Sequence, residues 1–127
     1  MHHLYVYGTL QYPEILKKLT GKNFISRPAV LNHLKRHKVK NAEYPAIVPN
    51  PGAQTTGMLI ENVDDLSLKA IDFFEGDEYE KTVVKVLADD TEKEAIAYVW
   101  IAGNNLLEEA DWDKAHFEKE YLKLYIS

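Results

Sequence analysis

The sequence predicts an α+β fold, in which about five or six strands form a twisted or barrel-like sheet accompanied by about three helices. Two observations lead to this prediction. Short runs of β-branched and aromatic residues recur along the chain, and apolar residues at helical spacing occur in a few segments only. These patterns do not alternate in the regular order of a parallel βαβ sheet. With 127 residues, the chain has the size of a single domain, residues 1–127.

The first strand, Leu4–Tyr7, is followed directly by a glycine turn and a short helix. Its residues are of the types that fit a pleated, half-buried strand. The predicted helix, Pro13–Thr20, has proline as its first residue. Gly21 follows it and is a residue type that often ends a helix. Such a joint can leave the backbone N–H groups of Gly8–Leu10 unpaired, as a nest for a carboxylate or an oxyanion. The alternative is an ordinary joint between a strand and a helix.

The next part of the chain reads as extended structure interrupted by turn signals. Arg27–Lys40 and Tyr44–Pro49 are both predicted to be extended, and Asn50-Pro51-Gly52 is predicted to be a turn. Gln54–Val63 reads as a further strand. Gly57 inside that strand indicates a bulge or a close approach of another backbone segment.

The second half of the chain begins with a helix that is capped within Asn62–Asp65 and ends at Glu75, before Gly76. Two strands follow, Lys81–Ala88 and Ala95–Ile101, and the second is apolar on both faces, which is typical of a central strand. We expect a turn at Asp89-Asp90 between them.

A final helix is predicted after Asp111, which is a suitable N-cap residue. Phe117, Tyr121 and Leu124 recur at helical spacing and define its apolar face, and Trp112 is expected to pack at its start.

Composition excludes several functional classes. The formal net charge of −5 argues against a general nucleic-acid binder. The one basic cluster, His33–Lys40, is short and is expected to form a solvated strand face, and its histidines make a poor metal site on a strand. There is no cysteine and no apolar run of the roughly 20 residues that span a membrane. The N-terminal residues carry no signal-peptide pattern, so we expect a cytoplasmic location.

Glu75 is the strongest candidate for acid–base chemistry. It lies at the negative end of a helix dipole, Asp72 stands one turn earlier, and Phe73 and Phe74 offer partial burial. All three features are expected to raise the pKa of Glu75, so that it can accept and donate a proton near neutral pH. The alternative is a solvated carboxylate at a helix end. A hydrolase with Asp72 and Glu75 as paired carboxylates is a weaker hypothesis, since both stand on one helical turn.

Two motifs together resemble the gamma-glutamylcyclotransferase-like family. The first motif is Tyr7-Gly8-Thr9-Leu10 at the end of the first strand, and the second is Asp72-Phe73-Phe74-Glu75-Gly76 followed by Tyr79. The nearest branch resembles the plant avirulence-induced proteins and the animal gamma-glutamylamine cyclotransferases. Further segments also fit that branch: Tyr44-Pro45-Ala46-Ile47, Gly57, Tyr98-Val99-Trp100 and Trp112-Asp113. The resemblance extends over nearly the whole chain, from Leu4 to Tyr121.

The resemblance implies a small mixed β-barrel flanked by helices, with Glu75 as the catalytic acid/base. It implies that Tyr7, Gly8, Thr9 and Leu10 hold the glutamyl group, and it places Tyr44 and Tyr79 among the substrate-binding residues. Two positions depart from the family pattern, because Glu43 stands where a basic residue is common and Lys81 where arginine is common. Lysine cannot clamp a carboxylate with the fork that arginine offers, so these departures bear on the identity of the substrate.

The implied reaction releases 5-oxoproline and an amine from a small gamma-glutamyl amide. The nucleophile is the substrate's own α-amine, so the protein needs no serine, cysteine, metal or cofactor. The alternative function is a non-catalytic domain that keeps the same pocket to bind a small ligand. The sequence does not identify the leaving amine or the oligomeric state.

Overall fold

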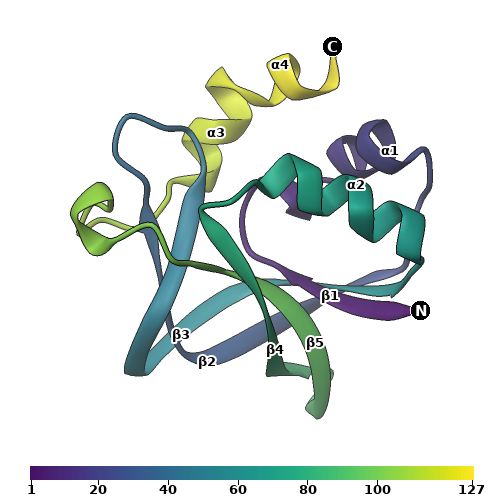
Figure 1. Cartoon of the computed structure of the whole chain (residues 1–127), viewed down its shortest axis with the longest axis horizontal. Coiled ribbons are helices and arrows are strands. Elements are labelled where there is room, and N and C mark those ends of the chain that lie inside the picture. The colour runs from purple at the N-terminus through teal and green to yellow at the C-terminus, as the bar shows by residue number, and fades with distance from the viewer.

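The computed structural model describes all 127 residues, and its centre is a closed five-stranded barrel (Figure 1). The strands are β1 (His2–Val6), β2 (Ser26–Lys38), β3 (Pro45–Val63), β4 (Tyr79–Ala88) and β5 (Thr91–Trp100). Their order around the barrel is β1-β3-β2-β4-β5. β1 meets β5 in parallel and the other neighbours are antiparallel, so the predicted mixed barrel is confirmed.

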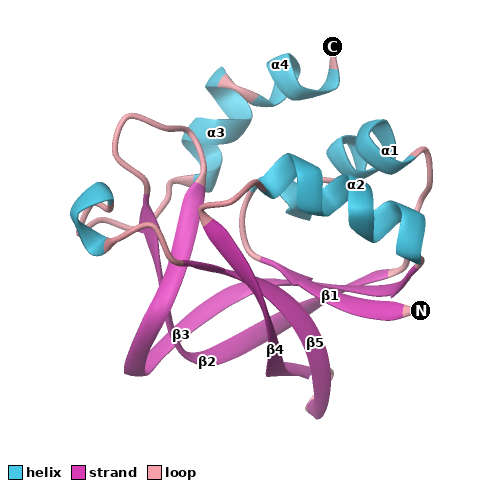
Figure 2. Cartoon of the chain, in the orientation of Figure 1, coloured by secondary structure: helices cyan, strands magenta, loops and turns pink.

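The helices gather on one side of the barrel and leave the opposite side to the strands (Figure 2). They are α1 (Pro13–Thr20), α2 (Asp65–Glu75), α3 (Lys114–Glu120) and α4 (Leu122–Ile126), with short 3-10 turns η1 (Thr9–Gln11) and η2 (Asn104–Leu106). α1 contacts both α2 and α4, which brings segments from the two ends of the chain together. No helix is sufficiently long and apolar to span a membrane.

Two large apolar cores and a smaller third one hold these layers together. One large core joins the barrel to the helices and includes Leu10, Ile71 and Phe117, each at most 2% exposed. The other large core fills the barrel and includes Tyr5 and Leu59, both fully buried. Burial of this much apolar surface is the main driving force for folding, and it fixes the barrel and the helices relative to each other.

Local sequence signals place the boundaries of α1 and α2. Gly21 and Gly76 follow these helices with φ of 78° and 80°, a backbone conformation that glycine adopts without a steric penalty. The carboxylate of Asp64 caps α2 by accepting hydrogen bonds from the N–H and the hydroxyl of Ser67. These predicted helix ends are therefore confirmed.

The turn predicted at Asn50-Pro51-Gly52 is wrong, because β3 runs through these residues without a chain reversal. Residues 50–53 instead form a bulge opposite His33, and the ladder with β2 resumes on either side. Within the bulge, Gly52 has φ of 84° and its N–H donates to Nδ1 of His33 at 3.2 Å. The turn residues thus bend a long strand rather than ending it.

The last helix also differs from the prediction. Asp113, and not Asp111, caps α3 by accepting a hydrogen bond from the N–H of His116. The helix is interrupted at Tyr121, so the helical face does not continue and Leu124 is 72% exposed. Trp112 does pack at the start of α3, with its ring 5.5 Å from that of Phe117.

Gly57 lies where β3 crosses β1 at very short range. A Cβ atom on this residue would stand 2.3 Å from the carbonyl oxygen of Val6. The predicted close approach is confirmed. It brings β3 against Val6, the last residue of β1.

Candidate active site

All seven residues that the sequence singles out line one pocket of about 190 Å³. They come from four separate segments of the chain, which the barrel and α2 bring together: Tyr7, Gly8, Thr9, Leu10, Tyr44, Glu75 and Tyr79. The structure adds further lining residues, of which Phe74, Glu78, Tyr98 and Tyr125 contribute side chains of chemical interest.

The loop after β1 carries backbone donors into the lining of this pocket. The N–H groups of Gly8, Thr9 and Leu10 donate no hydrogen bond within the chain, whereas those of the next two residues close the 3-10 turn. Gly8 packs against Pro45, and a Cβ atom on Gly8 would lie 2.6 Å from Cγ of that proline. Free, adjacent N–H groups of this kind suit a carboxylate or a developing oxyanion.

Glu75 is the last residue of α2 and is half-buried in the same pocket. No hydrogen-bond donor and no cation pairs with its carboxyl group. Burial raises the pKa of Glu75 from 4.5 to about 7. The predicted direction of the shift is thus confirmed, with burial rather than the helix dipole or Asp72 as its cause.

Asp72 stands one helical turn before Glu75, but its carboxylate is already paired with other residues of the chain. Its carboxylate accepts a hydrogen bond from the hydroxyl of Tyr98 and pairs with Lys81 at 2.9 Å. Asp72 does not line the pocket. The hypothesis of paired catalytic carboxylates therefore has no geometric support.

Five tyrosines surround Glu75 closely enough for its charge to raise their pKa values, although burial is the larger cause. The hydroxyl groups of Tyr7 and Tyr79 donate to the carbonyl oxygens of Tyr98 and Pro45, at 2.7 and 2.8 Å. Those of Tyr98 and Tyr125 donate to carboxylates, of Asp72 and Glu43 respectively. Tyr44 is different, because its hydroxyl has no partner in the chain. It is thus the one of these tyrosines whose hydroxyl is free for a ligand.

Comparison with known proteins places this pocket in a family. The family model described as "Gamma-glutamyl cyclotransferase, AIG2-like" matches residues 4–114, which include every predicted site residue. The chain belongs to this family. The AIG2-like match thus confirms the resemblance stated from the two sequence motifs.

Individual AIG2-like relatives agree with this membership. "Protein AIG2 C" of Arabidopsis thaliana is 32% identical over 114 residues, covering 88% of this chain and 69% of the relative. A solution structure of an A. thaliana protein superposes with a TM-score of 0.77 at 26% identity, over 98% of this chain and 77% of that one. A structure named "Gamma-glutamyl cyclotransferase" shares the fold, with a TM-score of 0.69 at 18% identity over 84% of this chain and 68% of that one.

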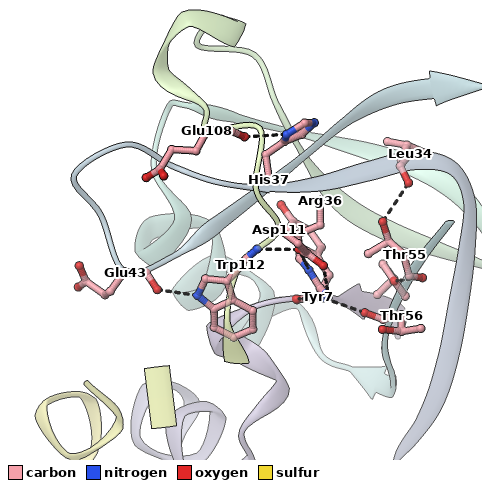
Figure 3. A network of polar contacts seen from close by, with 11 residues as sticks. Tyr7, Leu34, Arg36, His37, Glu43, Thr55, Thr56, Glu108, Asp111 and Trp112 are labelled. Carbon is pink, nitrogen blue, oxygen red and sulfur yellow. Dashed lines mark hydrogen bonds and ion pairs between the residues drawn. The ribbon is translucent and has the colours of Figure 1, made fainter. Parts of the chain in front are cut away.

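The two departures from the common AIG2-like pattern have defined positions. Lys81 pairs with Asp72 and does not line the pocket. The side chain of Glu43 accepts a hydrogen bond from the hydroxyl of Tyr125 at 2.8 Å. Its carbonyl oxygen accepts one from Trp112 Nε1, also at 2.8 Å (Figure 3). Neither residue is therefore placed to clamp a substrate carboxylate from the pocket lining.

The sequence did not indicate that Arg36 supports the loop that carries the site. The basic cluster was expected to form a solvated face, yet the side chain of Arg36 is only 14% exposed. It pairs with Asp111 and donates to the carbonyl oxygens of Tyr7 and Thr56, at 2.9 and 3.0 Å (Figure 3). The prediction is thus wrong for this residue, because cross-strand pairing turns it toward the site loop.

Tyr98 and Tyr125 were also missed as lining residues. Tyr98 was noted only as part of a motif, within a strand that is apolar on both faces. Tyr125 lies in α4, 50 residues after Glu75 in the sequence, and no local pattern links the two. Only the contact of α4 with the rest of the helical layer could reveal it.

Proposed function

We propose that this protein is a gamma-glutamyl cyclotransferase, an acyl-transfer enzyme that converts a small gamma-glutamyl amide into 5-oxoproline and a free amine. One observation supports this proposal above the others. Glu75, a carboxyl group without a partner, shares a pocket with the unpaired N–H groups of Gly8, Thr9 and Leu10. An acid/base beside a set of oxyanion donors is the equipment that an intramolecular acyl transfer requires.

In the proposed reaction, the α-amine of the glutamyl group attacks its own side-chain carbonyl carbon. A new C–N bond closes the five-membered lactam, and the bond between that carbon and the leaving nitrogen then breaks. The protein has to hold the flexible substrate in a folded conformer, in which the two reacting atoms are close. The buried residues Tyr7, Thr9 and Leu10, each at most 7% exposed, supply a rigid surface for this purpose.

Glu75 moves the proton in this scheme. As a carboxylate, it takes a proton from the substrate's α-ammonium group, which frees the electron pair for the attack. As a carboxylic acid, it returns the proton to the leaving nitrogen. The ring nitrogen still carries two hydrogens after the attack; it loses one of them as the lactam forms, and the released amine takes up a proton to become an ammonium ion. A pKa of about 7, raised by burial, allows both steps near neutral pH.

The loop residues Gly8–Leu10 stabilise the negative charge that develops on the substrate. As the tetrahedral intermediate forms, the carbonyl oxygen becomes negative, and the N–H groups of Gly8–Leu10 offer hydrogen bonds at that oxygen or at the substrate's α-carboxylate. The free hydroxyl of Tyr44 offers a further donor in the same pocket. The partner in this reaction is a small molecule.

The test is the release of 5-oxoproline from a panel of gamma-glutamyl amides, with Glu75→Gln measured beside the wild type. We expect turnover by the wild type and a loss of at least about 100-fold in the variant, with circular dichroism confirming that both are folded. Equal turnover in the two proteins would remove Glu75 from its role. No turnover by either protein would favour the non-catalytic ligand-binding domain.

A further inference from the structure

Tyr125 is the pocket residue that no sequence motif explains. It comes from α4, a helix of the outer layer (Figure 1). It lines the pocket together with residues of β1 and α2. Its ring lies 5.3 Å from that of Phe117 and 6.2 Å, edge to face, from that of Phe74. Phe74 immediately precedes Glu75, so Tyr125 packs against the end of α2 that carries the proposed acid/base.

The pocket has a buried floor and a half-open mouth. The floor consists of residues at most 7% exposed, among them Tyr7, Thr9 and Leu10. The mouth, defined here as Tyr44, Phe74, Glu78 and Tyr125, is more accessible, and Phe74 is 37% exposed. A glutamyl group held on the floor must therefore extend its leaving group past the rings of the mouth.

Glu43 fixes Tyr125 in that position. Its Oε1 accepts a hydrogen bond from the hydroxyl of Tyr125 at 2.8 Å. The same residue is anchored through its carbonyl oxygen, which accepts from Trp112 Nε1 at 2.8 Å (Figure 3). The bond joins α4 to the loop before β3, so the ring is held from both sides of the mouth.

We propose that Tyr125 is a specificity-determining residue, positioned by Glu43, that favours leaving amines with an aromatic or apolar group. The inference rests on the proposed function. Aromatic rings at the mouth recognise such a group by stacking or edge contact. The carboxylates of Glu43 and Glu78 beside the rings disfavour a leaving group that carries its own carboxylate.

The experiment compares gamma-glutamyl benzylamide with gamma-glutamyl methylamide, which share the glutamyl group and differ in what reaches the mouth. For the wild type, we expect a higher kcat/KM with the benzylamide. Tyr125→Ala should lower that preference, the ratio of kcat/KM for the two substrates, about 10-fold, mainly through a higher KM for the benzylamide. Glu43→Ala, which keeps the ring but frees it, should lower the preference in the same direction. An unchanged preference in both variants would overturn the proposal while leaving the proposed function intact.

Binding separates this proposal from the proposed function. Calorimetry with Glu75→Gln protein, with and without Tyr125→Ala, measures affinity for the benzylamide when no turnover occurs. A loss of affinity caused by Tyr125→Ala supports the proposal even if the wild type proves inactive. Equal affinities, or no binding by either protein, would overturn it. Leu124→Ala is the matched control, since this neighbour on α4 is 72% exposed and outside the pocket.

Discussion

Nη1 of Arg36 lies 2.9 Å from the carbonyl oxygen of Tyr7 and donates a hydrogen bond to it. The same guanidinium group forms a two-pronged pair with Asp111, at 2.7 and 3.2 Å. A strand residue outside the pocket thereby fixes the backbone just before the free N–H groups of Gly8–Leu10. The stability of the fold and the geometry of the site depend on the same side chain.

We expect Arg36→Lys to destabilise the protein by about 1–3 kcal/mol and to reduce turnover, because one ammonium group cannot replace the planar fork. Because the positive charge is kept, a loss of stability or turnover can be attributed to the loss of the guanidinium group's hydrogen-bond geometry. Urea denaturation gives the free energy of unfolding, and 5-oxoproline release gives turnover.

Arg27→Lys is the matched control for Arg36→Lys. Arg27 also stands on β2 and pairs with Glu61 and Asp89, but its side chain is 45% exposed. Exposed ion pairs contribute little to stability, so we expect Arg27→Lys to change the free energy of unfolding much less than Arg36→Lys does. Equal losses in the two variants would show that Arg36 has no special part in holding the site loop.

Gly57→Ala is expected to be among the most damaging small substitutions in the chain. The new Cβ atom would lie 2.3 Å from the carbonyl oxygen of Val6, so β1 and β3 would have to separate. We expect a loss of about 3 kcal/mol or more in the free energy of unfolding, measured by urea denaturation. Gly21→Asn is the control, because nothing surrounds this residue within 4 Å and asparagine tolerates its φ of 78°. A loss as large in the control would argue against the steric explanation.

The sequence predicted the parts of the fold that depend on neighbouring residues. Leu4–Tyr7 has strand-forming residues, and α2 has a cap at Asp64 and a glycine at its end, so both elements could be placed without knowledge of the rest. The direction of the pKa shift of Glu75 was also predicted, but its cause was not: burial in the pocket raises the pKa, and Phe73, which was expected to contribute to that burial, is 92% exposed.

The parts that the sequence did not predict depend on contacts between distant segments. Asn50–Gly52 has the composition of a turn, and only pairing with β2 turns it into a bulge. Asp111 and Asp113 are equally good caps by type, and the pairing of Asp111 with Arg36 leaves Asp113 to begin α3. Tyr125 reaches the pocket because α4 packs on the helical layer, a contact that no local pattern encodes.

Tyr44→Phe separates a hydroxyl that is free for the substrate from one that supports the fold. No group in the chain bonds the hydroxyl of Tyr44, so we expect unchanged stability and a KM raised about 5- to 20-fold. Tyr79→Phe is the comparison, since it removes the bond from that hydroxyl to the carbonyl oxygen of Pro45. That variant should lose about 1 kcal/mol of stability. A stability loss in Tyr44→Phe without any rise in KM would contradict the assignment.

The buried carboxyl group of Glu75 makes stability depend on pH in a defined direction. Its pKa is about 7 in the folded protein, against an ordinary value of 4.5, so the folded state binds the proton more tightly. Ionisation therefore costs the folded state free energy, and the cost develops as pH rises from about 4.5 to about 7. Below pH 4, both states are protonated and the cost is absent.

We therefore expect Glu75→Gln, which keeps the shape but cannot ionise, to be more stable than the wild type at pH 8 by about 2–3 kcal/mol. At pH 4, the two proteins should be equally stable. Urea denaturation across this pH range gives the difference directly. Glu78→Gln, which removes an exposed carboxylate from the lining of the same pocket, is the control for the loss of a negative charge there. If the stability gain of Glu75→Gln is constant with pH, burial does not shift the pKa of Glu75, and its proposed role as both proton acceptor and proton donor loses its physical basis.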